Sequence, residues 1–258
     1  MLSIIIVNFR TWAYTQRAID FLLSSIPPDI RPNRDMEIIV VDNHSKDACI
    51  QEFCRNNPNI RLYLSQGNYG YSHGCNQGAL HARGDWLLFM NPDVKTDWKT
   101  VNKLLEAAKA DSSHAIFTAR QLDESGKPQR TFAPFTTLAT ISPLVRALTR
   151  ATSPGGHPDP NRLREDSESI LTVDWVSGSL LLISRTNFKI LDGWNEDFWL
   201  YCEDEDLCKR ARNLGLLAAQ YCGATLTHTH ASSTRTTPEI RVLAKSEAII
   251  SKHVYIHK

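Results

Sequence analysis

The N-terminal third of the chain alternates short, continuous apolar runs with segments that carry apolar residues at helical spacing. Leu2–Asn8 is a β-branched run that ends in a polar residue, the pattern of a strand buried on both faces. Trp12–Ser25 has helical spacing and is stopped by the prolines that follow, and Glu37–Val41 is a second buried run. Strands that alternate with helices indicate parallel β-α-β units, so we expect an α/β fold.

Two further buried strands continue this pattern, Ile60–Leu64 and Trp86–Met90, with a Gly- and Asn-rich loop and a helix over Gly74–Arg83 between them. Polar residues stand where the strands end: Asp42 closes the second strand and Asp93 follows the fourth. Ligands of open parallel sheets bind outside the carboxyl ends of the strands. We therefore expect a ligand site at this edge of the sheet.

The second half of the chain is less regular. Residues 131–169 contain a looser, Pro- and Gly-containing stretch, which we interpret as an excursion from one domain spanning residues 1–258. The apolar run Leu180–Ile183 predicts a further core strand within 172–184, and Glu205–Leu214 predicts a helix that Gly215 ends. A closing helix is expected over Ile240–Tyr255, within residues 239–258.

Composition excludes some classes of protein. The 29 basic and 28 acidic side chains nearly cancel, which argues against a protein that works by neutralising nucleic-acid phosphates. The six cysteines form no Cys-x-x-Cys pair, so reduced thiols are expected. Neither a signal-peptide core nor an apolar run of about 20 residues is present. We expect a cytoplasmic protein that meets a membrane, if at all, at its surface.

Two weak motifs suggest a nucleotide site. Asp42 at a strand end could accept a hydrogen bond from the imide N–H of a uracil or thymine ring, although an Asp there is also a common helix cap. The loop Asn68–Gly78 places glycines and asparagines just before a helix, where backbone N–H groups favour an anion. An ordinary strand-to-helix loop is the alternative, and the spacing differs from the dinucleotide fingerprint.

A candidate metal ligand follows the strand Trp86–Met90, in the motif Asn91-Pro92-Asp93. A carboxylate at a strand end suits Mg²⁺ or Mn²⁺, which take few protein ligands and several substrate oxygens. A second ligand is needed, and His228 or His230 is the best candidate. Side chains one residue apart on a strand point to opposite faces, so a regular strand would offer only one of the two.

The strongest local signal is the acidic run Glu203-Asp204-Glu205-Asp206, which follows an aromatic-rich stretch and begins a predicted helix. Carboxylates crowded beside apolar walls have raised pKa values and can act as general bases. Charge runs are more often solvated surface, and Glu205 and Asp206 could simply stabilise the helix macrodipole. We expect Asp204 to be the base and Glu203 to shape its pKa or contact the acceptor.

Taken in order, these segments resemble the family 2 glycosyltransferases, especially the bacterial rhamnosyltransferase-like members. The matching segments span nearly the whole chain and are Ile6-Val7-Asn8-Phe9, Val40-Val41-Asp42-Asn43-His44-Ser45, Asn68 to Gly78, Phe89-Met90-Asn91-Pro92-Asp93, Trp175-Val176-Ser177-Gly178-Ser179, Gly193-Trp194-Asn195-Glu196-Asp197-Phe198, Glu203-Asp204-Glu205-Asp206-Leu207 and His228.

The resemblance implies a single-domain GT-A fold with a Rossmann-like, mostly parallel sheet, a nucleotide-diphosphate sugar donor, a divalent metal (Mg²⁺ or Mn²⁺) and inversion at the anomeric carbon. Carried over by motif, Asp42 would bind the base, Asp93 and His228 the metal, and Asp204 would be the catalytic base. Asn91 stands where a D-x-D motif has its first Asp, which puts the metal affinity in question more than the fold.

The same resemblance suggests which other residues line the two substrate sites. The donor site is expected to include Asn8, Asp42, Asn43, Asn68, Gly70, Asn76, Asn91, Asp93 and Gly178. The acceptor site is expected to include Trp175, Trp199 and Glu203.

The implied donor is dTDP-rhamnose and the implied acceptor a hydroxyl of a lipid-linked or cell-surface glycan, as in polysaccharide or lipopolysaccharide assembly. A UDP-hexose donor, a catalytically silent sugar-nucleotide or glycan-binding module, and a nucleotidyltransferase are the alternatives. The last would want a basic, glycine-rich loop after the first strand, which Asn8–Thr11 does not provide.

One segment of the excursion suggests peripheral contact with the inner membrane. Apolar residues between Leu138 and Leu148 stand at near-helical spacing, with Arg146 and Arg150 one turn apart. Such a basic amphipathic stretch can rest on an anionic membrane, and a helix that packs on the sheet is the alternative.

Overall fold

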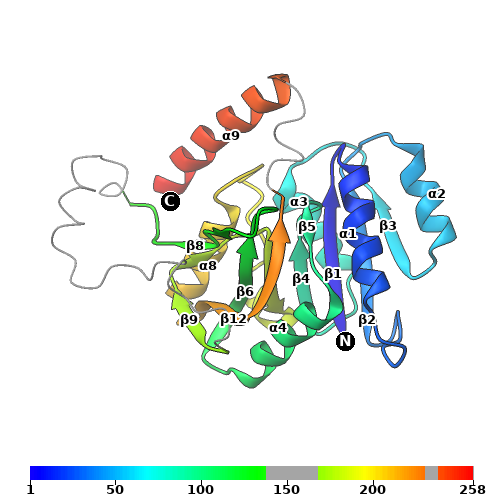
Figure 1. The fold of residues 1–258 in the computed structure, drawn as a ribbon. Coiled ribbons are helices and arrows are strands. Elements are labelled where there is room, and N and C mark those ends of the chain that lie inside the picture. The colour runs from blue at the N-terminus through cyan, green and yellow to red at the C-terminus, as the bar shows by residue number, and fades with distance from the viewer. Residues whose placement is uncertain (138–167, 230–237, 258) are drawn as a thin grey trace.

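A computed structural model describes residues 1–137, 168–229 and 238–257. Its N-terminal half contains four parallel strands in the order β3-β2-β1-β4 (Figure 1). They are β1 (Leu2–Asn8), β2 (Met36–Asp42), β3 (Ile60–Leu64) and β4 (Trp86–Met90). Every residue of β1 and β2 is buried, which explains why both sequences are continuously apolar instead of alternating. The register pairs Asn8 with Asp42, so both strands end at the same edge.

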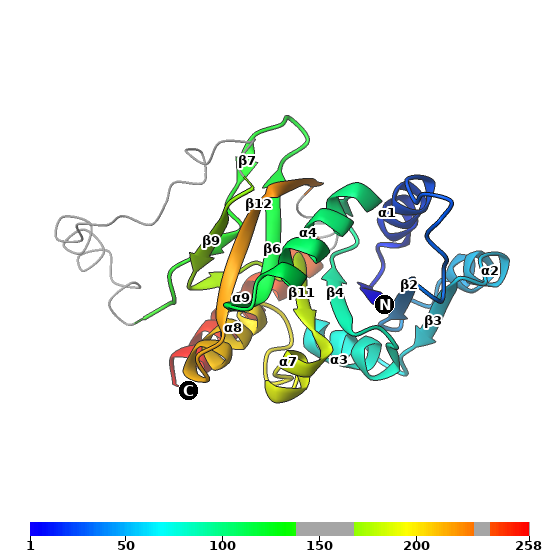
Figure 2. The ribbon, with the colours of Figure 1, turned by 90° about the horizontal axis from the view of Figure 1, so that it is seen from below.

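Helices cover both faces of the sheet. Each face carries one buried apolar cluster. Helices α1, α2 and α4 pack on one face, and α3, α7 and α8 pack on the other (Figure 2). Their bounds are α1 (Trp12–Ser24), α2 (Ala48–Asn56), α3 (Tyr71–His81), α4 (Trp98–Ala110), α7 (Arg185–Ile190) and α8 (Glu203–Asn213). Helix α3 begins three residues before the predicted start, because Gly70 at φ 96° turns the chain directly into it.

The sheet continues beyond β4 in the order β11-β6-β12-β5. These strands are β5 (Val94–Lys95), β6 (His114–Leu122), β11 (Leu180–Ser184) and β12 (Leu217–His228). Strand β12 is parallel to β6, whereas β11 runs antiparallel to both of its neighbours, β4 and β6. The mostly parallel α/β sheet predicted from the sequence is confirmed, with the antiparallel strand β11 near its middle and the short antiparallel strand β5 at its edge.

Short strands flank this sheet. β7 (Pro128–Gln129) pairs with β6, and β9 (Ile170–Val173) pairs with β12. β8 (Phe132–Ala133) and β10 (Trp175–Val176) form a separate two-stranded sheet. The expected excursion therefore carries β8 at its start. Residues 138–167, which include Arg146 and Arg150, and His230 lie outside the described residues.

The closing helix, α9 (Pro238–Ile256), spans most of the region expected for it, and Lys258 lies outside the described residues. In Figure 1 it lies across the end of the molecule where β1 and its parallel neighbours finish. Within the described residues, no helix is both long and apolar enough to cross a bilayer. All six cysteines are free thiols.

Candidate active site

A cavity of about 400 Å³ opens at the carboxyl ends of β1 and β4, the edge that the sequence pattern predicted. This volume lies in the range of pockets that hold small molecules and cofactors. Its walls come from the strand ends, the loop before α3, the turn before β11, the start of α8, the end of β12 and α9. The lining residues are Val7, Phe9, Thr11, Asn43, Asn68, Gly70, Tyr71, Asn91, Pro92, Asp93, Ser177, Gly178, Ser179, Trp199, Leu200, Tyr201, Glu203, Asp204, His228, Leu243 and Ala244.

Asp93 and His228 meet in the lining of the cavity, although 135 positions separate them in the chain. Strand β5 pairs with the end of β12 and sets His228 opposite Val94, next to Asp93. The Nε2 atom of His228 lies 3.1 Å from Oδ1 of Asp93, and both side chains are more than nine-tenths buried. Sheet pairing, and not a local motif, thus assembles this pair.

Hydrogen bonds behind His228 fix its ring. Gln121 donates from Nε2 to the Ser179 hydroxyl at 2.7 Å, which leaves its Oε1 to accept from Nδ1 of His228 at 3.0 Å. With the proton on Nδ1, the lone pair of Nε2 faces the Asp93 carboxylate. Two acceptors that face each other at this distance need a proton or a cation between them.

The donor set of this pair suits a divalent cation. Neighbouring ligands at about 2.1 Å from an octahedral ion are about 3 Å apart, and the Asp93 and His228 atoms are 3.1 Å apart. Groups of three or more potential ligating side chains are absent from the described residues, so the other ligands would be substrate oxygens or water. The residues present therefore fit the expected metal.

Asp204 lies at the start of α8 and faces the same cavity. Its Oδ2 accepts from the Gly178 N–H at 2.9 Å and its Oδ1 from the Glu205 N–H at 2.9 Å. Burial among apolar neighbours raises the pKa of Asp204 to about 6, against the two N–H groups, which favour the charged form. The side chain still keeps part of its surface open to the cavity, as a base that must reach a substrate requires.

Glu203, the neighbour of Asp204, is buried, and its Oε2 has no hydrogen-bond partner within the described part of the chain. Burial and then the charge of Asp204 raise the pKa of Glu203 well above its usual range. Protonation of Glu203 therefore removes the like-charge repulsion that two adjacent carboxylates would otherwise have. The two carboxyl groups therefore differ in charge, with Asp204 ionised and Glu203 neutral.

The other two carboxylates of the acidic run have structural partners. Glu205 accepts hydrogen bonds from the backbone N–H and the hydroxyl of Thr136, and Asp206 accepts from Nε of Arg210 at 2.7 Å. Neither side chain lines the cavity.

A strained turn aims the start of α8 at the cavity. Tyr201 and Cys202 have φ of 71° and 64°, a left-handed conformation that costs non-glycine residues about 1–3 kcal/mol each. Contacts from distant elements hold this turn: the Ser251 hydroxyl on α9 donates to the Leu200 carbonyl at 2.8 Å, and the Tyr71 N–H donates to the Trp199 carbonyl at 2.8 Å. The position of Asp204 therefore depends on both α3 and α9.

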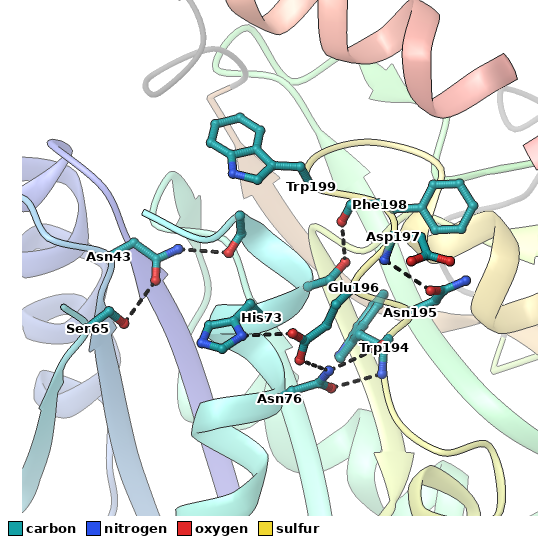
Figure 3. Close-up of polar contacts among 12 residues, drawn as sticks. Asn43, Ser65, His73, Asn76, Trp194, Asn195, Glu196, Asp197, Phe198 and Trp199 are labelled. Atoms are coloured by element: carbon teal, nitrogen blue, oxygen red, sulfur yellow. Dashed lines mark hydrogen bonds and ion pairs between the residues drawn. The ribbon is translucent and has the colours of Figure 1, made fainter. Parts of the chain in front are cut away.

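Hydrogen bonds pin the loop 194–199 to α3 (Figure 3). Asn76 donates to the Trp194 carbonyl and to Glu196, and accepts from the Trp194 N–H, all between 2.8 and 2.9 Å. His73 contacts Glu196 at 2.8 Å, and the Ser72 hydroxyl donates to the Phe198 carbonyl at 2.9 Å. Asn76, expected in the donor site, thus lies outside the cavity lining and positions the loop that carries Trp199.

Gly70 is required where this loop meets α3. A Cβ there would lie 2.5 Å from the Trp199 carbonyl oxygen, and the φ of 96° disfavours any other residue. The Asn43 side chain donates to the Gly70 carbonyl at 2.8 Å, and the Trp199 indole N–H donates to the Asn68 carbonyl at 3.4 Å. These four residues, all expected from the sequence, line one wall of the cavity.

Asn8 and Asp42 are close to the cavity but do not line it. Asn8 donates to Asp42 at 2.7 Å, and its Oδ1 accepts from the hydroxyls of Thr11 and Thr15. The second carboxylate oxygen of Asp42 accepts from the Ser45 N–H at 2.9 Å. Protein donors thus already bind both oxygens of Asp42, and the pair orders the wall beside Asn43.

The tryptophan expected beside Trp199 in the acceptor site lies elsewhere. Trp175 lies on β10, donates to the Pro134 carbonyl at 3.0 Å, and is absent from the lining. Of the remaining expected residues, Asn91 and Gly178 line the cavity with Asp93.

Comparison with known families matches residues 3–164 to the model described as "Glycosyl transferase family 2". The chain belongs to glycosyl transferase family 2. The matched range covers β1 to β4 and includes Asp93, whereas Asp204 and His228 lie beyond it.

Among curated proteins, this family 2 chain is 23% identical, over 95% of its length and 81% of the other protein, to the N-acetylglucosaminyl-diphospho-decaprenol L-rhamnosyltransferase of Mycobacterium tuberculosis. It is 26% identical to the rhamnosyltransferase WbbL of Escherichia coli, over 84% of this chain and 78% of that one. The similarity to rhamnosyltransferases predicted from the sequence is therefore confirmed.

Among solved structures, the mannosyltransferase PcManGT from Pyrobaculum calidifontis, in complex with GDP-Man and Mn²⁺, aligns with a TM-score of 0.61. The alignment covers 98% of this chain and 63% of that one at 14% identity, so this chain spans less than two thirds of that protein. A likeness at this identity concerns the fold, and it confirms the GT-A architecture.

Several residues in or behind this family 2 site were not expected from the sequence. Gln121, which orients His228, belongs to β6, a strand that the sequence pattern did not predict. Leu243 and Ala244 reach the cavity because α9 folds back over it. Tyr71, whose hydroxyl donates to the Gly178 carbonyl at 3.1 Å, stands in the matched Asn68–Gly78 motif and could have been found there.

Proposed function

We propose that this chain is an inverting, metal-dependent glycosyltransferase that moves L-rhamnose from dTDP-rhamnose to a hydroxyl of a lipid-linked or cell-surface glycan. The observation that carries the proposal is that the Asp93–His228 pair and the base Asp204 line one cavity. The Asp93–His228 pair suits a cation with phosphate oxygens, and Asp204 suits the role of proton acceptor. The choice of donor rests on the rhamnosyltransferases among the relatives.

In the proposed reaction, Asp204 accepts the proton of the acceptor hydroxyl. The oxygen so activated forms a bond to the anomeric carbon, the bond from that carbon to the diphosphate oxygen breaks, and its electron pair leaves with the nucleoside diphosphate. A single in-line displacement of this kind inverts the anomeric configuration.

The Asp93–His228 pair and Asp204 contribute separate effects to the reaction. Asp93 and His228 would hold the divalent cation, which neutralises charge on the departing diphosphate when bound. The Gly178 and Glu205 N–H groups hold the Asp204 carboxylate in place, and neutral Glu203 beside it adds no second charge. Gly70 and Trp199, which contact each other closely, line the same cavity.

A donor screen tests the proposal. Thermal unfolding is measured with dTDP-rhamnose, UDP-glucose, UDP-galactose and GDP-mannose, each with Mn²⁺ or with a chelator. A donor at about 100 times its Kd adds about 2.7 kcal/mol to the stability, so we expect a rise in Tm of roughly 5–10 °C for dTDP-rhamnose with Mn²⁺.

Turnover then separates the alternatives. Slow release of dTDP from dTDP-rhamnose, and an inverted glycoside with a lipid-linked acceptor, are the expected results. Transfer from a UDP-hexose alone would replace the donor, and donor binding without hydrolysis or transfer would favour a silent binding module. Full activity in the presence of chelator would refute the metal.

A further inference from the structure

Helix α9 presents large apolar side chains to solvent. Val242, Leu243, Ile249 and Ile250 are 65%, 45%, 72% and 52% exposed. They stand seven positions apart in two pairs, and seven residues make nearly two helical turns, so they form adjacent rows on one side of the helix. Exposed apolar side chains that form a contiguous patch mark protein or membrane contact sites, whereas singly exposed ones are ordinary surface.

The opposite side of α9 attaches the helix to the protein. Ala244, Ser251 and Tyr255 are buried. The Ser251 hydroxyl donates to the Leu200 carbonyl, and the Lys209 ammonium lies 4.6 Å from the centre of the Tyr255 ring. Apart from Leu243, which also reaches the cavity, the apolar rows therefore face outward on a helix whose inner side is packed against the turn that precedes Asp204.

Basic residues flank the apolar rows. Arg241, Lys245 and Lys252 are exposed, and at about 100° per residue they fall on one flank of the helix. The acidic Glu247 is only partly exposed, so the exposed charge among the described side chains of α9 is mainly positive. An apolar face with a lysine and arginine border is the pattern of a helix that lies in the interface of an anionic membrane.

The helix stands beside the opening of the cavity. Leu243 and Ala244 contribute to the lining, and Figure 1 shows α9 as the outermost element above the carboxyl ends of the parallel strands. A bilayer against the outer side of α9 would therefore lie next to the cavity that holds Asp204.

We propose that the outer face of α9, consisting of Val242, Ile249, Ile250, Arg241, Lys245 and Lys252, docks on an anionic phospholipid bilayer and brings the cavity to a lipid-linked acceptor. The acceptor part rests on the proposed function, whereas the docking does not. The sequence alone suggested the segment from Leu138 to Arg150 for this contact, and the described structure instead offers α9.

Co-sedimentation with vesicles tests the docking. We expect the full chain to bind phosphatidylglycerol-containing vesicles, to bind phosphatidylcholine vesicles more weakly, and to be released by salt. The triple variant Val242→Gln, Ile249→Gln, Ile250→Gln should lower the bound fraction by roughly tenfold or more, because the apolar contact is lost. Lys245→Gln with Lys252→Gln should weaken binding to anionic vesicles only.

A matched control removes exposed apolar side chains elsewhere. Leu80 on α3 and Leu214 after α8 are 72% and 59% exposed, and the double variant Leu80→Gln, Leu214→Gln should bind vesicles like the wild type. Light scattering reports the oligomeric state of every form. Any of three results would overturn the docking. These are a wild type that does not bind anionic vesicles, a triple variant that binds them normally, and a wild type that is a dimer while the triple variant is a monomer.

Donor assays keep this inference separate from the proposed function. The triple variant should retain the donor-induced rise in Tm, since its three positions do not line the cavity. It should lose transfer to an acceptor embedded in vesicles and keep transfer to a detergent-solubilised one. Vesicle binding that depends on α9 in a protein with no transfer activity would uphold the docking and refute the function.

Discussion

The lining of the cavity holds two pairs of titratable groups, Asp93 with His228 and Asp204 with Glu203, which we call the metal end and the acid end of the site, and the two pairs differ in how they carry charge. At one end Asp93 faces His228, whose ring is fixed by Gln121. At the other end Asp204 adjoins Glu203, a second carboxyl group buried without a partner for Oε2 in the described structure. The first end combines a carboxylate with an imidazole lone pair, and the second combines two acids.

This difference assigns a different role to each end. A carboxylate and an imidazole oriented by a hydrogen bond leave a place for a cation. Two adjacent buried carboxyl groups cannot both ionise cheaply, so their pKa values rise and one group is left able to accept a proton near neutral pH. Substitution of Asp204 should therefore impair proton transfer, and substitution of Asp93 or His228 should impair cation-dependent donor binding.

The largest expected effect is at the acid pair. Asp204→Asn removes the proton acceptor and should lower kcat by roughly 10²–10⁴-fold, while the donor-induced rise in Tm stays near the wild-type value. Because burial raises the pKa of Asp204 to about 6, wild-type kcat should rise about tenfold per pH unit below that value and level off above it. Steady-state rates between pH 5 and 8 measure both effects.

The control is the same substitution two residues further along α8. Asp206→Asn leaves the side chain near Arg210 and outside the cavity, so its kcat and pH profile should match those of the wild type. Near-normal turnover in Asp204→Asn, or a pH profile that it shares with the wild type, would remove Asp204 from the role of base.

A smaller effect, on metal affinity, is expected from Gln121, which lies behind His228 and touches no substrate. Gln121→Met keeps the volume of the side chain but removes the oxygen that accepts from Nδ1 of His228. Partners behind a metal ligand contribute about 10–100-fold to affinity, so the Mn²⁺ concentration for half-maximal donor binding should rise by that factor. Asp93→Asn, which removes a ligand itself, should abolish the Mn²⁺ dependence.

Gln129 provides the comparison for Gln121. Its side-chain amide donates to the His228 carbonyl at 3.0 Å and not to the ring, so Gln129→Met should leave the Mn²⁺ requirement close to that of the wild type. Equal Mn²⁺ requirements in Gln121→Met and the wild type would mean that Gln121 does not orient a ligand.

The parts of the fold that sequence patterns predicted are those with local causes. β1, β2 and β4 are buried on both faces, so their runs are continuously apolar, and the residues after them mark the sheet edge. Asp93 and Asp204 were predicted because each stands in a motif whose order along the chain matches the family. Both line the cavity.

The parts that were not predicted depend on pairings between distant segments. His228 was expected beside Asp93 from the family resemblance and not from a local pattern, and the two meet because β12 pairs with β5. Gln121, which no motif indicated, reaches His228 because β12 also pairs with β6. Asn8 and Asp42, both expected in the donor site, lie opposite each other in the parallel register and hydrogen bond to each other, which the motifs did not indicate. Single-residue motifs cannot indicate which of these partners a side chain will have.

The smallest expected effect is on folding stability, which the burial of the Glu203 carboxyl group lowers as pH rises. Glu203 has a pKa raised in the folded state, so above its unfolded value of about 4.3 the unfolded chain releases a proton that the folded chain retains. The wild type therefore loses stability as pH rises, and Glu203→Gln, which has no proton to lose, does not. The Tm of this variant should equal that of the wild type near pH 4 and exceed it by a few degrees at pH 8. As a comparison, Glu205→Gln should lower the Tm, because Thr136 loses an anionic acceptor. A Glu203→Gln variant less stable than the wild type at every pH would mean that the Glu203 carboxylate is charged and compensated, and the division of the acid pair into a base and a neutral neighbour would then fail.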